Sequence, residues 1–243
     1  VYNLMKEKER GGPMTQDEHL SEAIQDYLKA IYELSPMGGG STSTNQLADR
    51  LSVAPASVTG MLKRLATMDP PLIDYQKHRG VQLTDAGKQV SLRIIRKHRL
   101  IELFLVQTLG YSWDEVHEEA ERLEHAVSFR FSERLARFLG EPDFDPHGDP
   151  IPNRDLHLPA MQTIPLSEAR EGQQVKVRRV LSSDPALLRY LGKLGIRPGA
   201  RLSVSAGCRL TERFISPLRM TRLSAFWDRK SAFYCKSRLY KEK

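Results

Sequence analysis

The stretch from His117 to His125 contains two histidines and four glutamates. Apolar residues recur through it at three- and four-residue spacing, which predicts a helix. They are Trp113, Val116, Ala120, Leu123 and Val127. At about 100° per residue, four polar side chains share an arc of roughly 100° beside that apolar stripe. They are His117, Glu121, Glu124 and His125. Imidazole nitrogen and carboxylate oxygen suit divalent first-row metals, so the stretch is a candidate metal site, with a solvated acidic face as the alternative.

Further donors occur on two other predicted helices. His98 and Glu102 are four residues apart and therefore share one face of a long helix. Asp26 lies beside the apolar stripe of the first helix. Each has an ordinary alternative, an i,i+4 surface contact for the pair and a solvated side chain for the aspartate. A metal site becomes the stronger hypothesis if the fold brings the three helices together.

Length and composition are those of a globular protein with one to three small domains. The chain has 243 residues, of which 40% are hydrophobic and 28% charged. No apolar run approaches the roughly 20 residues that a membrane span needs, and the first residues lack the apolar core of a signal peptide. Two cysteines imply no disulfide framework. We therefore expect a cytoplasmic protein without membrane contact.

The net charge of +7 is concentrated at one end of the chain. Residues 201–243 carry eleven Lys or Arg against three Asp or Glu, whereas residues 1–200 carry 26 against 27. Overall basicity therefore says little about the first 200 residues, and a case for DNA binding has to rest on local features.

The N-terminal third predicts a winged helix-turn-helix after a flexible leader of residues 1–19. Apolar spacing predicts helices over 20–34, 43–51 and 56–68, with Pro55 in the first turn of the third. Two helices joined by a tight turn form a helix-turn-helix. Strands over 72–75 and 80–84 flank a basic turn, which predicts the wing.

The predicted DNA-binding residues lie on the second helix of that motif and on the wing. Small polar residues at the helix start would face bases, and basic residues would hold phosphates. The candidates are Pro55, Ser57, Thr59, Lys63, Arg64, Lys77 and Arg79.

The rest of the chain predicts helices, a linker and a small β-domain. A long helix over 86–109 is followed by the metal-site helix and by an apolar pattern at Phe129, Phe131, Leu135 and Phe138. This exposed apolar potential indicates a dimer interface. Six prolines between 140 and 165 predict an extended, semi-stiff linker. Strands over 174–180 and 196–204 and a helix over 184–194 begin a barrel, and the pattern degrades after Gly207.

These segments resemble the diphtheria-toxin-repressor family of metal-dependent transcriptional regulators, which includes iron-responsive and manganese-responsive branches. The resemblance runs from about residue 20 to 204, in an ordered set of motifs. They are QDYLKAIYEL (25–34), PASVT (55–59), RGVQLT (79–84), KHRL (97–100), VHEEAERLEH (116–125) and PHGDPIP (146–152). It implies a mainly α-helical protein with an N-terminal winged helix, a helical dimerisation domain and a small C-terminal SH3-like (FeoA-type) barrel.

The resemblance divides the donors into two metal sites. One would use Asp26, Glu121, Glu124 and His125. The other would use His98, Glu102 and His117, with an auxiliary carboxylate from the barrel at Asp184. The implied domains are 20–88 for DNA binding, 89–140 for metal binding and dimerisation, 141–165 for the linker and 166–243 for the barrel with an atypical basic tail.

Three departures from the patterns of the family's branches bear on the choice of metal. Asp26 and Glu121 stand where that branch has a methionine and a cysteine, so the site has no sulfur and favours Mn²⁺, with Fe²⁺ as the alternative. Zn²⁺, Co²⁺ or Cd²⁺ would bind in vitro. Lys29 replaces a carboxylate of the short manganese branch, and Leu187 stands where a glutamine ligand is common, which weakens the case for ligation through the barrel.

We therefore expect a metal-activated homodimer that binds a palindromic operator in double-stranded DNA and represses metal-uptake genes. A winged-helix regulator that senses a small organic ligand would not need donors on three helices. A metallo-hydrolase would need a substrate pocket and a base, for which the sequence has no further motif, and would have no use for a helix-turn-helix. The sequence therefore favours a regulator over an enzyme.

Overall fold

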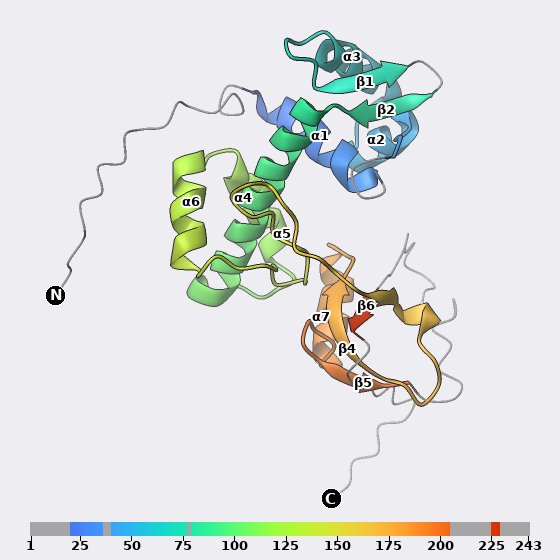
Figure 1. Cartoon of the computed structure of the whole chain (residues 1–243), viewed down its shortest axis with the longest axis vertical. Helices are drawn as coiled ribbons and strands as arrows, with labels where there is room; N and C mark the ends of the chain where they lie inside the picture. Colours follow the sequence, from blue (N-terminus) through green and yellow to red (C-terminus); the bar gives the residue numbers. More distant parts are fainter. Residues whose placement is uncertain (1–19, 36–39, 77–78, 205–224, 229–243) are drawn as a thin grey trace, which may run out of the picture. The chain divides into compact units, whose positions relative to one another are not determined.

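We describe the protein from a computed structural model, in which residues 20–35, 40–76, 79–204 and 225–228 are described (Figure 1). The chain divides into two compact units. The first contains residues up to Ile95 together with Val127–Phe131, and the second contains Arg96–Ala126 and the chain from Ser132 onwards. The predicted leader, residues 1–19, lies outside the described residues.

The first unit is built on three helices that share one apolar core. They are α1 (Glu22–Leu34), α2 (Thr44–Leu51) and α3 (Pro55–Ala66). Leu28, Leu47 and Leu62 are fully buried in this core. Ser43 caps α2 through a reciprocal capping box with Gln46, which satisfies two backbone N–H groups at the start of the helix. The predicted helix-turn-helix is thereby present, each helix within about two residues of its expected bounds.

The wing follows as an antiparallel hairpin of β1 (Ile73–Gln76) and β2 (Gly80–Leu83) (Figure 1). Val81 and Leu83 face the core, while Gln82 between them is exposed, as the two-residue period of a half-buried strand requires. Thr84 then caps the next helix, because its hydroxyl oxygen accepts the backbone N–H of Gly87.

That helix, α4 (Asp85–Leu109), begins in the first unit and continues into the second. In the first unit the Ser91 hydroxyl donates to the Leu28 carbonyl on α1 (3.0 Å). α5 (Val116–Glu124) follows in the second unit, and α6 (Phe129–Phe138) belongs to that unit from Ser132 onwards. The Phe104 ring of α4 packs edge-on against Phe138 of α6, with the ring centroids 6.1 Å apart.

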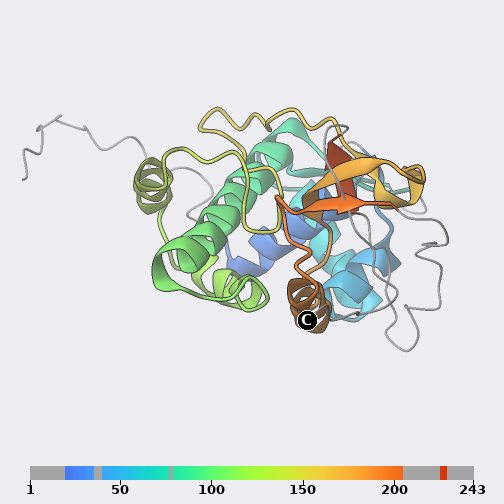
Figure 2. The same cartoon turned by 90° about the horizontal axis from the view of Figure 1, so that it is seen from below.

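The C-terminal part of the second unit contains a four-stranded sheet with the order β3-β6-β4-β5. Its elements are β3 (Ile164–Pro165), the 3₁₀-helix η3 (Leu166–Glu168), β4 (Gln174–Val180), α7 (Pro185–Lys193), β5 (Arg201–Ser203) and β6 (Ala225–Asp228). α7 lies beside this sheet (Figures 1 and 2). Its Leu188 and the sheet residues Val175 and Val177 are fully buried in one cluster.

Three features differ from the sequence expectations. Trp113 precedes α5 instead of lying on it, and its side chain joins the core of the sheet domain. The proline-rich segment is not extended throughout, because the backbone around Asp145–Pro152 folds back on itself and is largely buried. Ala225–Asp228, in the region where the strand pattern degrades, pairs with β3 and β4. The rest of the tail lies outside the described residues.

Within the described ranges, no helix has both the length and the apolar content needed to cross a bilayer.

Candidate metal centre

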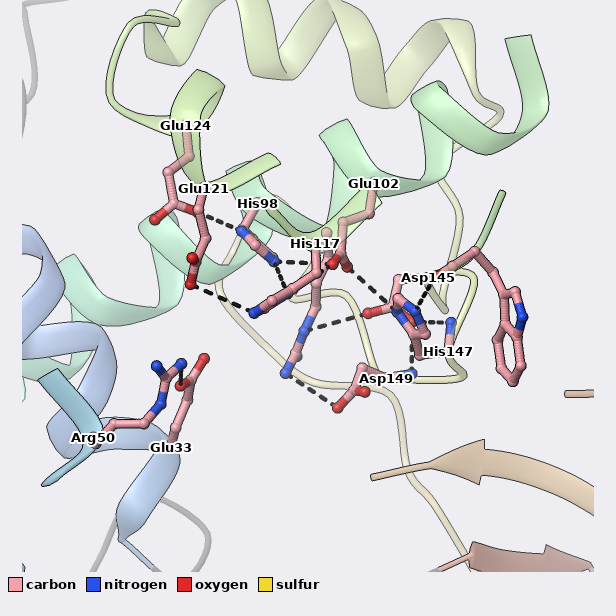
Figure 3. A network of polar contacts seen from close by, with 12 residues as sticks. Glu33, Arg50, His98, Glu102, His117, Glu121, Glu124, Asp145, His147 and Asp149 are labelled. Atoms are coloured by element: carbon pink, nitrogen blue, oxygen red, sulfur yellow. Dashed lines mark hydrogen bonds and ion pairs between the residues drawn. The ribbon is translucent and has the colours of Figure 1, made fainter. Parts of the chain in front are cut away.

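Helices α4 and α5 bring three of the predicted ligands together (Figure 3). His98 and Glu102 lie one turn apart on α4, and His117 lies in the first turn of α5. His98 Nε2 is 3.1 Å from His117 Nδ1, and both nitrogens are 3.1 Å from Glu102 Oε1. Three donor atoms therefore form a triangle with nearly equal sides.

The size of this triangle is close to that of three donors around one small divalent cation, whether six-coordinate or tetrahedral. Metal–ligand bonds of about 2.2 Å at right angles, between the lengths usual for Mg²⁺ and Ca²⁺, place neighbouring donors about 3.1 Å apart. A tetrahedral zinc centre with bonds of about 2.0–2.1 Å would place them about 3.3–3.4 Å apart. Two histidines and one carboxylate on one face of an octahedron are a known ligand set for divalent iron, and oxygen-rich octahedral sites suit manganese. The residues present therefore fit a divalent metal ion of this class.

Glu102 has the charge state that a ligand needs. Burial alone would raise the pKa of its carboxyl group, but the charge of His98, hydrogen bonds from His117 and His98, and the nearby His147 hold that pKa well below its usual range. The carboxylate form is therefore the stable one, although only 2% of the residue is exposed.

The second nitrogen of each histidine is held by a carboxylate from α5. His98 Nδ1 is 2.5 Å from Glu124 Oε2, and His117 Nε2 is 3.4 Å from Glu121 Oε1. Carboxylates in this position fix the tautomer of a metal-binding histidine and the orientation of its ring. Glu121 and Glu124, which the sequence assigned to a separate site, therefore also contact the ligands of this one.

The remaining predicted ligands are distributed as follows. His125 caps the C-terminus of α5, and its Nε2 is 3.6 Å from Glu124 Oε1. Asp26 is a partly exposed residue of α1 in the first unit. Asp184 caps α7, where its Oδ1 accepts the backbone N–H of Ala186 (2.8 Å). It belongs to none of the described groups of possible metal ligands.

Two buried residues close to the centre were not among the predicted ligands. Glu102 forms a second group of possible ligands with Asp145 and His147 (Figure 3). Burial and the charges of Asp149 and Glu102 raise the pKa of Asp145 to about 8. Burial lowers the pKa of His147, but the neighbouring Glu102, the charge of Asp145 and the hydrogen bond to the Trp113 carbonyl together outweigh this and raise that pKa to about 9. The available signal was the motif PHGDPIP, in which a histidine and an aspartate flank a glycine directly after Asp145.

The predicted DNA-binding residues lie on α3 and the wing. Pro55, Ser57, Lys63 and Arg64 are exposed, which leaves them available to a ligand. Thr59 is half-buried, and its hydroxyl donates to the Pro55 carbonyl (3.1 Å). Arg79 is exposed at the end of the wing, and Lys77 lies outside the described residues.

Three family models match the chain in order. "Iron dependent repressor, N-terminal DNA binding domain" matches residues 19–81, "Iron dependent repressor, metal binding and dimerisation domain" matches 84–153, and "FeoA domain" matches 164–215.

Proteins of known function agree with these matches. The iron-dependent repressor IdeR of Mycobacterium leprae is 30% identical over 197 residues, which cover 76% of this chain and 84% of that protein. The diphtheria toxin repressor of Corynebacterium jeikeium is 33% identical over 213 residues, 77% of this chain and 86% of that protein. A solved structure of a manganese-dependent transcriptional repressor in complex with manganese has a TM-score of 0.68 and 43% identity, and covers 75% of this chain and 83% of its own.

A winged helix followed by a cluster of histidine and carboxylate side chains that could hold a metal ion is the arrangement of a metal-responsive DNA-binding regulator. The chain belongs to the iron-dependent repressor family, whose members include the diphtheria toxin repressor. It is a metal-dependent transcriptional repressor, and its family is not a class of enzymes.

Proposed function

We propose that this repressor is activated by Mn²⁺, with Fe²⁺ as a weaker activator, and that it controls genes for metal uptake. The observation that carries the proposal is the donor chemistry. Nitrogen and oxygen make up the whole predicted ligand set, and Asp26 and Glu121 stand where the iron branch has sulfur ligands. Oxygen-rich sites suit Mn²⁺, whereas thiolate and thioether ligands select softer ions. The likeness to a manganese-dependent repressor supports the same choice.

The activating site would use Asp26, Glu121, Glu124 and His125, and a second site His98, Glu102 and His117. A bound cation supplies positive charge that stabilises neighbouring carboxylates at short distance. Asp26 belongs to α1 of the DNA-binding unit, whereas the other three residues belong to α5 or its C-terminus. Ligands drawn from both units would favour one relative orientation and so link metal binding to a DNA-competent form. Asp184 contributes at most an auxiliary ligand.

The repressor would act in the cytoplasm as a homodimer on a palindromic operator. Phe138 on α6 is 67% exposed and Leu109 at the end of α4 is 56% exposed. These exposed apolar side chains support a dimer interface on the helices of the second unit. A two-fold dimer presents two recognition helices and therefore reads two related half-sites. The proposed domains are residues 20–88 for DNA binding, 89–140 for metal binding and dimerisation, 141–165 for the linker and 166–243 for the FeoA-type barrel with its tail.

The first prediction is that sequence-specific DNA binding requires the metal. Fluorescence anisotropy with a labelled candidate operator measures it, using Mn²⁺, Fe²⁺ under anaerobic conditions and Zn²⁺, each at saturation and each repeated with a chelator. We expect tight binding with Mn²⁺, weaker binding with Fe²⁺, and loss of binding with the chelator. Saturation matters because Zn²⁺ has a higher general affinity than Mn²⁺ in the Irving–Williams order. Zn²⁺ can therefore bind the protein more tightly without activating DNA binding.

Two results would contradict the proposal. Sequence-specific DNA binding that persists in the presence of the chelator would refute the proposal that metal activates the repressor. Activation by iron or zinc but not by manganese would leave a metal-dependent repressor and refute the argument from hard ligands.

A further inference from the structure

The segment around Asp145–Asp149 lies between α4 and β4 and contacts both. On the α4 side, Arg99 donates to the Pro150 carbonyl (2.5 Å) and lies 3.4 Å from Asp149. On the β4 side, the Val180 N–H donates to the His147 carbonyl (2.9 Å), and Arg179 forms an ion pair with Asp149. The segment therefore joins the helix that carries His98 and Glu102 to the FeoA domain.

Trp113 gives the FeoA domain a second attachment to the helices. It lies in the connection between α4 and α5, yet its ring is buried in the FeoA core with Val175 and Leu188. The guanidinium of Arg197 lies 5.4 Å from the centre of the ring. A buried tryptophan is among the largest contributions that one side chain makes to an interface. We call this contact the Trp113 seat.

His147 connects the Trp113 seat to the metal centre. Its Nε2 donates to the Trp113 carbonyl (2.6 Å), and its ring stacks on the indole with centroids 5.8 Å apart and planes 26° apart. Its Nδ1 lies 3.8 Å from Glu102 Oε2. Glu102 thus directs Oε1 to His98 and His117 and Oε2 to His147. Because His147 is 5% exposed, solvent does not compete for these contacts.

We propose that His147 is a positioning residue, which fixes the Glu102 carboxylate for metal binding and ties its orientation to the Trp113 seat of the FeoA domain. A carboxylate rotates about its last bond unless its second oxygen is held. Partners of this kind outside the ligand set change metal affinity about 10- to 100-fold when they are removed. Through this contact the FeoA domain supports the metal centre in a way that does not depend on ligation by Asp184. The inference rests on the proposed role of Glu102 as a metal ligand.

Three substitutions separate the two contacts of His147. His147→Phe keeps an aromatic ring against Trp113 but removes both nitrogens. In His147→Asn the amide nitrogen takes the place of Nδ1 and reaches Glu102 but not the Trp113 carbonyl. In His147→Gln it takes the place of Nε2 and reaches that carbonyl instead. Asn and Gln carry the same amide group, but Asn can contact Glu102 and Gln can contact the Trp113 carbonyl.

The test uses the full chain with Trp227→Phe, so that Trp113 is the remaining tryptophan of the two in the sequence. Manganese binding is followed by electron paramagnetic resonance of free Mn²⁺, and the Trp113 seat by tryptophan emission. We expect His147→Phe and His147→Gln to lower the affinity of one Mn²⁺ equivalent about 10-fold or more. His147→Asn keeps the contact with Glu102 and loses the one with Trp113, so it should lose less affinity than either, and the emission maximum should be unchanged in Phe and Gln.

His98→Ala is the reference that identifies the equivalent concerned. If His98→Ala removes no Mn²⁺ equivalent, the proposed second site is wrong and His147 has no ligand to position. If His98→Ala removes one but His147→Phe binds as the parent does, the positioning role alone is refuted. Equal losses in His147→Asn and His147→Gln would assign the effect to packing and also refute it. If His147→Phe does not fold, the comparison of His147→Asn with His147→Gln tests the positioning role by itself.

Discussion

At the scale of single residues, Glu124 links two groups of ligands that the sequence kept apart. Its Oε2 is 2.5 Å from His98 Nδ1 and its Oε1 is 3.6 Å from His125 Nε2, and only 1% of the residue is exposed. Sequence resemblance assigned His98 to one site and Glu124 with His125 to the other. Because Glu124 contacts both histidines, it belongs to the surroundings of both proposed sites.

Glu124→Ala should therefore weaken Mn²⁺ binding at both proposed sites, whereas His125→Ala should weaken it at one. Removing Glu124 takes a proposed ligand from one site and the orienting partner of His98 from the other, so Mn²⁺ affinity should fall at both, about 10-fold or more at the second. His125→Ala should lower affinity at one site and leave the other close to wild type. Calorimetric titration with Mn²⁺ resolves the two. Two sites that lose affinity equally in both variants would contradict this assignment.

At the scale of elements, the turn around Gly148 determines how closely the proline-rich segment approaches β4. Gly148 has φ +86°, and a Cβ atom there would collide with the Arg178 carbonyl. Gly140, after α6, has φ +80°, but a Cβ atom there would meet no other atom within 4 Å. The two glycines have the same backbone conformation and different surroundings, which makes one a control for the other.

Gly148→Ala should destabilise the protein far more than Gly140→Ala. Alanine in the left-handed conformation costs about 1–2 kcal/mol, which is the expected loss at Gly140. At Gly148 the collision with backbone adds to that cost, and a total above about 4 kcal/mol is expected. Denaturant unfolding followed by circular dichroism measures both. Similar losses in the two variants would show that the segment moves away from β4 at little cost.

Elements also show how far the sequence could predict this molecule. Period and capping residues placed α1, α3 and α4 within about two residues, since an amphipathic helix carries its own signal. Trp113 was misplaced because periodicity identifies a buried residue but not the core that buries it. The prolines of 145–152 predicted an extended linker. Their carbonyls are instead bound from α4, by Arg96 at Pro152 (2.7 Å) and by Arg99 at Pro150. Such long-range contacts leave no local pattern.

The candidate site was predictable to the extent that ligands share a helix. His98 with Glu102, and Glu121 with Glu124, are one turn apart, so their common face follows from helix geometry. The close approach of His147 to Glu102 depends on a segment that returns to α4 some 40 residues later, and spacing alone could not show it.

At the scale of the whole molecule, the first unit carries the exposed residues proposed for DNA binding, and the second carries the cluster of proposed metal ligands His98, Glu102 and His117. DNA affinity in such a repressor contains a term from phosphate contacts, which depends on salt, and a term from metal occupancy, which does not depend on salt in the same way. Substitutions of the basic residues proposed to hold phosphates on α3 should therefore change the first term alone.

Lys63→Ala should weaken binding to operator and to unrelated DNA by a similar factor. It should also reduce the slope of log affinity against log salt by about 1, because one phosphate contact is lost. Lys193→Ala, an exposed lysine in the last turn of α7 in the FeoA domain, is the control and should leave the slope unchanged. Anisotropy titrations at several salt concentrations, with saturating Mn²⁺, provide the measurement. A loss confined to the operator would instead mean that Lys63 reads bases.

Metal choice is also a property of the whole molecule, because the proposed activating ligands come from both units. Asp26→Met together with Glu121→Cys would introduce the sulfur ligands of the iron branch and should shift activation from Mn²⁺ towards Fe²⁺. The readout is DNA binding at saturating metal, since affinity alone follows the Irving–Williams order whatever the geometry. Asp26→Asn with Glu121→Gln is the matched control, which removes the charges without adding sulfur and should abolish activation by either metal. A double variant that still prefers Mn²⁺ would show that other residues, such as the buried Lys29 of α1, determine selectivity.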